Sequence, residues 1–223
     1  MAFSMNNAIT RILRAVADPD GYTYCDAAYQ SAPTNMDGLA KDIFWESVLA
    51  IMQIMYSKPI KAGEQTDEVI NIQSLFTNDD VIGLITTAET SILASGKISL
   101  TGLTQYYKLI DIYPNPEGTT PLPLCVKKID VDYFKGVMIA DFVDDNTIFW
   151  YDTGSSVTFY PKEQVTTIEN YKVDVVYVKQ PLLSAWDGTS GDAKDLCELF
   201  SLPFIFKAIN MASAKINKEK EVV

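Results

Sequence analysis

Residues 149–160 read FWYDTGSSVTFY, and this stretch decides the fold of the second half of the chain. Two β-prone runs, 147–151 and 157–160, lie on either side of the polar segment 152–155. Asp, Gly and Ser are favoured in such segments because they adopt or stabilise the backbone angles of tight turns. The stretch therefore predicts a β-hairpin.

Further β-prone runs extend outward from this hairpin. They cover residues 97–103, 106–113, 126–131, 137–142 and 171–178. In the last run, aromatic and valine residues alternate with Lys172 and Asp174, which is typical of a half-buried strand. The four prolines in residues 114–123 exclude a helix or a central strand there, since proline lacks an N–H donor and has a fixed φ. The pattern predicts an antiparallel β region over residues 96–180.

The first 95 residues are predicted to be mainly helical. The apolar residues of the first helix recur at i, i+3, i+4 and i+7, and the helix stops at the turn residues 18–21. The apolar residues of this helix are Ile9, Ile12, Leu13 and Val16. A second helix, 36–57, is apolar around much of its circumference. This indicates burial on more than one side, either within the fold or against a neighbouring subunit.

A third helix is predicted after Asn78-Asp79-Asp80, which offers an N-cap and negative charge where the helix dipole favours it. Its expected inner face consists of Val81, Ile85, Ala88 and Ile92. Gly96 is well placed to end this helix, because glycine readily adopts the left-handed conformation of a C-terminal cap.

The last predicted element is an amphipathic helix within residues 195–219, which begins near Pro203 with Ser201 just before it. Its lysines lie mainly towards its C-terminal end, where the helix dipole favours positive charge. Together these elements predict an α+β fold over residues 1–223, with a mainly helical first part (1–95), an antiparallel β part and a C-terminal helix.

Composition limits the function of the chain. Its 223 residues are 48% hydrophobic and 21% charged, which is ordinary for a folded protein. A net charge of −11 and the lack of an extended basic cluster disfavour sequence-specific nucleic-acid binding. No apolar run reaches the roughly 18 residues that a membrane span needs, so we expect no membrane partner. Cys25, Cys125 and Cys197 have no short spacing and are interpreted as free thiols.

The sequence predicts no catalytic, metal or cofactor site. It contains no histidine, which removes Ser-His and Cys-His nucleophile systems and histidine metal ligands. Carboxylate-pair hydrolysis is one alternative, raised by Asp130, Asp132, Asp141, Asp144 and Asp145. Calcium binding is another, raised by Asp141, Asp144, Asp145 and Asn146. Hairpin turns explain Asp-Asp-Asn at 144–146 equally well, and the spacing does not match an EF-hand loop.

The second half of the chain resembles the head-to-tail connector (adaptor) proteins of short-tailed bacteriophages. In these proteins a Tyr- and Gly-containing hairpin ends in a proline, a Tyr-rich strand runs into a proline corner, and a Leu-Pro helix closes the chain. The matching stretches here are 121–123, 149–161, 171–177, 179–181 and 202–203, with an approximate match at the corner. The acidic composition, rich in Tyr and Asn, is most similar to the ring proteins of crAss-like phages.

This resemblance implies a single adaptor-like domain that forms a ring of twelve copies below the portal protein. Such a ring extends the channel through which double-stranded DNA passes, belongs to the virion, and assembles in the cytoplasm of the bacterial host. Net negative charge suits such a wall, because a basic lining would hold the phosphates. We therefore expect a non-enzymatic structural protein.

The expected contacts with neighbouring copies and the portal come from the apolar second helix, the hairpin with the loop after residue 178, and the final helix. They are Phe44, Val48, Ile51, Met55, Tyr151, Tyr160, Trp186, Phe204, Lys207 and Lys215. An alternative hypothesis is a carbohydrate- or receptor-binding virion module. It requires Trp150, Tyr151, Tyr160 and Trp186 on an exposed surface.

Overall fold

The computed structural model describes residues 3–20, 23–24, 38–57, 72–115, 125–129, 147–160, 172–182 and 195–221. The predicted strand 137–142, the group of carboxylates at 130–145 and Trp186 lie outside these ranges. The chain folds as two compact units. The helical unit comprises Met1–Leu84 and Pro181–Val223, and the β unit comprises Ile85–Gln180. Helices and antiparallel strands together make this an α+β fold, as the sequence predicts.

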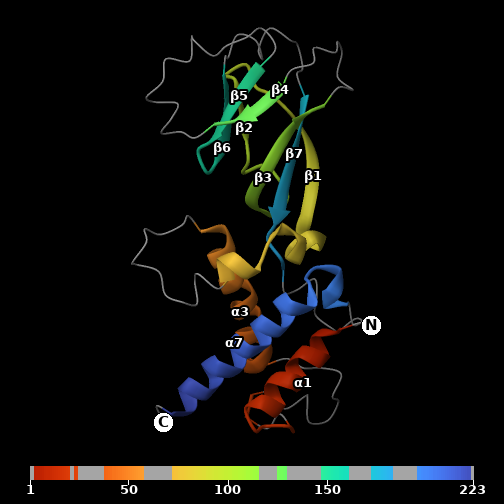
Figure 1. The fold of residues 1–223 in the computed structure, drawn as a ribbon, viewed down its shortest axis with the longest axis vertical. Coiled ribbons are helices and arrows are strands. Elements are labelled where there is room, and N and C mark those ends of the chain that lie inside the picture. The colour runs from red at the N-terminus through yellow and green to blue at the C-terminus, as the bar shows by residue number, and fades with distance from the viewer. Residues whose placement is uncertain are drawn as a thin grey trace. The chain divides into compact units, whose positions relative to one another are not determined.

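Three α-helices form the core of the helical unit. They are α1 (Met5–Ala15), α3 (Leu39–Tyr56) and α7 (Leu202–Glu221). The α7 helix packs against both α1 and α3 (Figure 1). The first, second and C-terminal helices expected from the sequence are thus confirmed, and their apolar stripes face one another in this core.

Local signals explain where these helices begin and end. The Ser4 hydroxyl accepts a hydrogen bond from the Asn7 N–H at 3.2 Å and so caps α1. Ala17, with a φ of +58°, lies in the left-handed region just after the helix. At α7, the Ser201 hydroxyl accepts a hydrogen bond from the Phe204 N–H at 3.3 Å. Pro203 is tolerated in this first turn because its missing N–H would have no helical partner there.

Two short 3₁₀ helices meet next to the start of α7. They are η1 (Asn78–Leu84) and η5 (Leu196–Glu198). The Ser201 N–H donates to the Asp80 carbonyl oxygen at 2.9 Å, and the Ser201 hydroxyl donates to the Asp80 carboxylate. Gly83 lies directly against the backbone of Glu198 and Leu199, because a Cβ atom at this position would be 1.7 Å from the Glu198 carbonyl oxygen. The lack of a side chain at Gly83 therefore permits this contact.

In the described part of the β unit, seven strands form two sheets. The strands are β1 (Ile85–Ser91), β2 (Lys97–Ser99), β3 (Tyr106–Pro114), β4 (Cys125–Lys128), β5 (Thr147–Asp152), β6 (Ser156–Tyr160) and β7 (Lys172–Lys179). One sheet has the order β1-β7-β3 and the other β2-β6-β5-β4. The hairpin predicted over residues 147–160 is confirmed: β5 and β6 pair antiparallel around Gly154, which has a φ of +92°.

The two sheets share one apolar core. Its buried residues come from strands of both sheets and from the segment after β2; they are Ile98, Leu100, Leu109, Ile112, Ile148, Trp150, Val157, Phe159, Val173, Val175 and Tyr177. Along β7 the buried and half-buried residues alternate, as the pattern of this run predicts. The sheets therefore pack face to face.

The predicted third helix is wrong. Residues 78–84 form η1, and residues 85–91 form strand β1, whose Ile85 pairs with Val178 of β7. The run ITTAETS is rich in β-branched residues, which fit a strand better than a helix, and β7 offers a full antiparallel partner. The β part of the chain thus begins at Ile85 instead of residue 96.

One pairing differs from the expected antiparallel arrangement. Strand β4 runs parallel to β5, with Cys125 opposite Thr147 and Lys128 opposite Trp150. Parallel neighbours need a long connection between them, whereas a short turn gives an antiparallel pair. The direction of β4 is therefore not encoded in its own four residues.

Candidate interaction surface

A basic stripe covers the outer face of α1. Asn7, Arg11 and Arg14 recur at i, i+4 and i+7, and all three are exposed, while Ile9 and Ile12 are buried on the opposite side. Arg11 and Arg14 are the only arginines in the chain. The helix contains no acidic residue. The outer face of α1 is therefore positively charged in a chain with a net charge of −11.

Two phenylalanine rings hold the Arg11 side chain. The guanidinium carbon of Arg11 lies 5.3 Å from the centroid of the Phe3 ring and 4.8 Å from that of the Phe206 ring. The two rings meet edge to face at a centroid distance of 5.7 Å. A guanidinium over aromatic faces gains cation–π energy and loses rotamer freedom. Arg11 is thus held in place while still exposed.

The carboxylate of Asp195 fixes the position of Phe3. One carboxylate oxygen accepts hydrogen bonds from the Phe3 N–H at 2.7 Å and from the Cys197 N–H at 2.9 Å. In addition, the Leu196 N–H donates to the Phe3 carbonyl oxygen at 2.8 Å. The two backbone donors lower the pKa of Asp195, because they stabilise its charged form. The N-terminal segment is thereby tied to the segment before α7.

Acid is expected to weaken this link. Because the pKa of Asp195 is lower in the folded chain, its contribution to stability is present above the ordinary pKa of an aspartate and is lost as the pH falls through the folded value. We expect Asp195→Asn to lower the free energy of unfolding at pH 7, and the difference from the wild type to shrink as the pH falls below about 4. Urea unfolding at pH 7 and pH 3 measures this.

The control for this experiment is Asp20→Asn, in the exposed turn after α1. Asp20 makes no recorded hydrogen bond within the described part of the chain, so its replacement is expected to change little. A difference between wild type and Asp195→Asn that stays constant from pH 7 to pH 3 would contradict the assigned role of the carboxylate.

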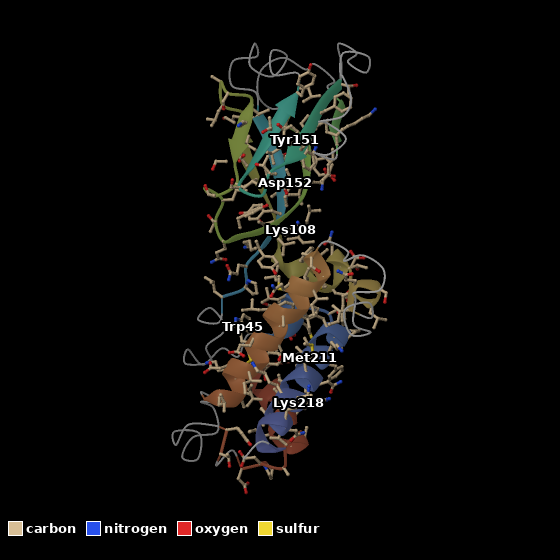
Figure 2. The ribbon with its side chains drawn as sticks, turned by 90° about the vertical axis from the view of Figure 1, so that its left-hand side faces the viewer. Trp45, Lys108, Tyr151, Asp152, Met211 and Lys218 are labelled. Atoms are coloured by element: carbon tan, nitrogen blue, oxygen red, sulfur yellow. The ribbon has the colours of Figure 1, made fainter. Side chains whose placement is uncertain are left out.

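An open groove lies between α3 and α7. Its volume is about 250 Å³, and its lining consists of Glu46, Ser47, Ala50, Met211, Ala214, Lys215 and Lys218. Small side chains let the two helices approach each other, and an exposed ion pair between Lys215 and Glu46 joins them across the groove. Met211 and Lys218 follow each other along α7 (Figure 2). Exposed ion pairs contribute little to stability, so we expect the pair to add little to the packing of α3 on α7.

The structure places the predicted interface residues in three groups. The side chains of Phe44, Val48, Ile51 and Phe204 are at most 1% exposed and lie in the core of the helical unit. Because these four side chains pack within their own chain, they present no surface to a neighbouring copy in this structure. Half-buried or exposed positions hold Met55, Tyr151, Tyr160, Lys207 and Lys215. Trp186 lies outside the described residues.

The aromatic side chains of the β unit differ in burial. Trp150 is fully buried, so its predicted exposure in a carbohydrate-binding module is wrong. Tyr151 and Asp152 follow it on β5 (Figure 2) and are half-buried. Burial raises the pKa of Tyr106 to about 12, and the negative charge of Asp152 acts in the same direction. Tyr106 therefore remains neutral at ordinary pH.

The described ranges contain neither a metal-binding cluster nor a membrane-spanning helix. There, no group of three or more His, Cys, Asp or Glu side chains is arranged to hold a metal ion. Nor does any helix in those ranges combine the length and apolar character that crossing a bilayer requires.

No family model matches the sequence. A search of curated proteins likewise finds no significant match. The candidate surface therefore stands on geometry and charge alone, and the sequence did not single it out. The signal that could have found it is the placement of both arginines, three residues apart, on the polar side of the first predicted helix.

Proposed function

We propose that the protein is a structural virion protein that forms a ring in the head-to-tail connector of a short-tailed bacteriophage. In this role it lies below the portal and extends the channel through which DNA passes. The observation that supports this most is the order of elements in the second half of the chain. Hairpin β5–β6 is followed by strand β7 and then by helix α7, which opens with Leu202-Pro203. This is the order in the connector proteins that the sequence resembles.

The charge of the chain is compatible with this role. A net charge of −11 disfavours retention of double-stranded DNA on the wall of a channel. The proposal assigns no catalysis and no cofactor, and it locates the protein in virions assembled in the bacterial cytoplasm.

Helix α7 offers a surface for the portal or a further ring. Its inner residues pack on α1 and α3, whereas Asn210, Ala214 and Asn217 recur at i, i+4 and i+7 on its exposed side. Exposed Lys215 and Lys218 add positive charge near its C-terminal end. A long helix with one face buried in its own subunit leaves the other face for a partner.

Electron microscopy of the purified protein tests this proposal. We expect closed rings with cyclic symmetry, with twelve copies as the number that the resemblance implies. When the portal protein encoded in the same genome is added, we expect the rings to co-sediment with it. A protein that stays monomeric at micromolar concentration and does not bind that portal would exclude the proposed role.

A further inference from the structure

Among the residues that the structure describes, the basic stripe of α1 has no counter-charge. Within the described part of the chain, neither Arg11 nor Arg14 forms an ion pair with a carboxylate. The other sixteen basic residues of the chain are lysines. An arginine presents a planar fork of donors that binds a carboxylate or a phosphate through two parallel hydrogen bonds. Both residues suited to this kind of contact are thus exposed on a single helix face.

Arg11 is already ordered before any partner binds. The guanidinium of Arg11 lies over the rings of Phe3 and Phe206, and Asp195 in turn fixes Phe3. Immobilising a long side chain on binding costs conformational entropy, and prior ordering reduces this cost. A single well-placed arginine is among the residues that most often dominate a protein interface.

The two arginines suit a protein partner better than a nucleic acid. Duplex binding depends on several phosphate contacts, and two arginines in a chain of net charge −11 provide few of them. Carboxylates, in contrast, are abundant on the chain itself, which has 29 acidic and 18 basic residues. A ring joins two different surfaces of neighbouring copies, so a basic face on one copy requires an acidic face on the next.

We propose that Arg11 and Arg14 form one half of the contact between neighbouring copies of this chain, where they bind carboxylates of the adjacent copy. This inference rests on the proposed ring and names the surface that builds it. Phe3 and Phe206 act as positioning residues, since they hold the Arg11 fork ready to receive the carboxylate.

Sedimentation velocity over a range of protein concentrations tests this contact. We expect the double variant Arg11→Gln/Arg14→Gln to raise the dissociation constant of the assembly about 100-fold, since it removes two arginines that anchor the contact. Arg11→Lys/Arg14→Lys keeps the charge but loses the fork, so we expect a smaller rise of about 10-fold. The matched control is Lys97→Gln/Lys127→Gln, which removes two exposed charges from the β unit and is expected to leave assembly unchanged.

The possible outcomes separate this inference from the ring itself. If the wild type assembles and the double glutamine variant assembles equally well, the contact is wrong while the ring stands. A wild type that remains monomeric overturns both. A double variant that assembles normally but loses retention on duplex DNA assigns the stripe to nucleic acid and overturns the contact. Arg14→Gln alone, which touches neither ring, is expected to weaken assembly about 10-fold even if the double variant folds poorly.

Discussion

Replacing Gly83 with alanine is expected to destabilise the helical unit by about 3 kcal/mol or more. The new Cβ atom would be 1.7 Å from the Glu198 carbonyl oxygen and 2.7 Å from the Leu199 Cα atom. Overpacking a well-packed site typically costs about 1–3 kcal/mol, and here the obstacle is backbone that cannot rotate away. Relief requires η1 and η5 to separate, which strains the two hydrogen bonds between Ser201 and Asp80.

Two other glycines provide matched controls for this substitution. At Gly102 a Cβ atom meets nothing within 4 Å, so Gly102→Ala is expected to be nearly neutral. Gly154 also has open space around it but a φ of +92°, so Gly154→Ala is expected to cost about 1–2 kcal/mol through backbone strain alone. Urea unfolding followed by circular dichroism measures all three. A cost at Gly83 no larger than that at Gly154 would show that η1 and η5 do not pack as described.

The elements that sequence could predict are those whose signals are local. The apolar stripe of α1, the alternation along β7 and the turn at Gly154 each follow from neighbouring residues, and each is found where expected. The helix predicted over Val81 to Ile92 failed because a helical spacing of four apolar residues is weak evidence. The threonines between them favour a strand once β7 is available, and that partner lies more than 80 residues away in sequence.

The candidate surface depends on contacts that no local pattern reveals. The exposed stripe of α1 is visible in the sequence, but the ordering of Arg11 requires Phe206, which lies almost at the other end of the chain. The same holds for Asp195, whose bond to the Phe3 N–H spans 192 residues. Three of the four predicted interface residues of α3, Phe44, Val48 and Ile51, are buried within the chain for a related reason. Hydrophobicity shows that Phe44 and Val48 will be buried but not whether the same chain or a neighbour buries them.

Replacing Trp150 with alanine is expected to have the other large effect, a loss of about 3–5 kcal/mol in the free energy of unfolding of the β unit. Trp150 is fully buried in the core between the two sheets, so its removal leaves a cavity lined by both. In the sheet, Trp150 pairs with Phe159 of β6 and with Lys128 of β4. The Lys128 amine lies 5.3 Å from the centroid of the Trp150 ring. Urea unfolding of the variant measures the loss.

The matched variant is Trp150→Phe, which keeps an aromatic ring and removes the indole N–H. That N–H is buried and has no hydrogen-bond partner in the described part of the protein. An unsatisfied buried donor costs about 1–3 kcal/mol, so removing it offsets much of the packing lost with the smaller ring. We therefore expect Trp150→Phe to cost less than about half as much as Trp150→Ala. Equal losses in the two variants would mean that the indole N–H does have a partner, such as a buried water, whose hydrogen bond stabilises the fold as much as the packing of the ring does.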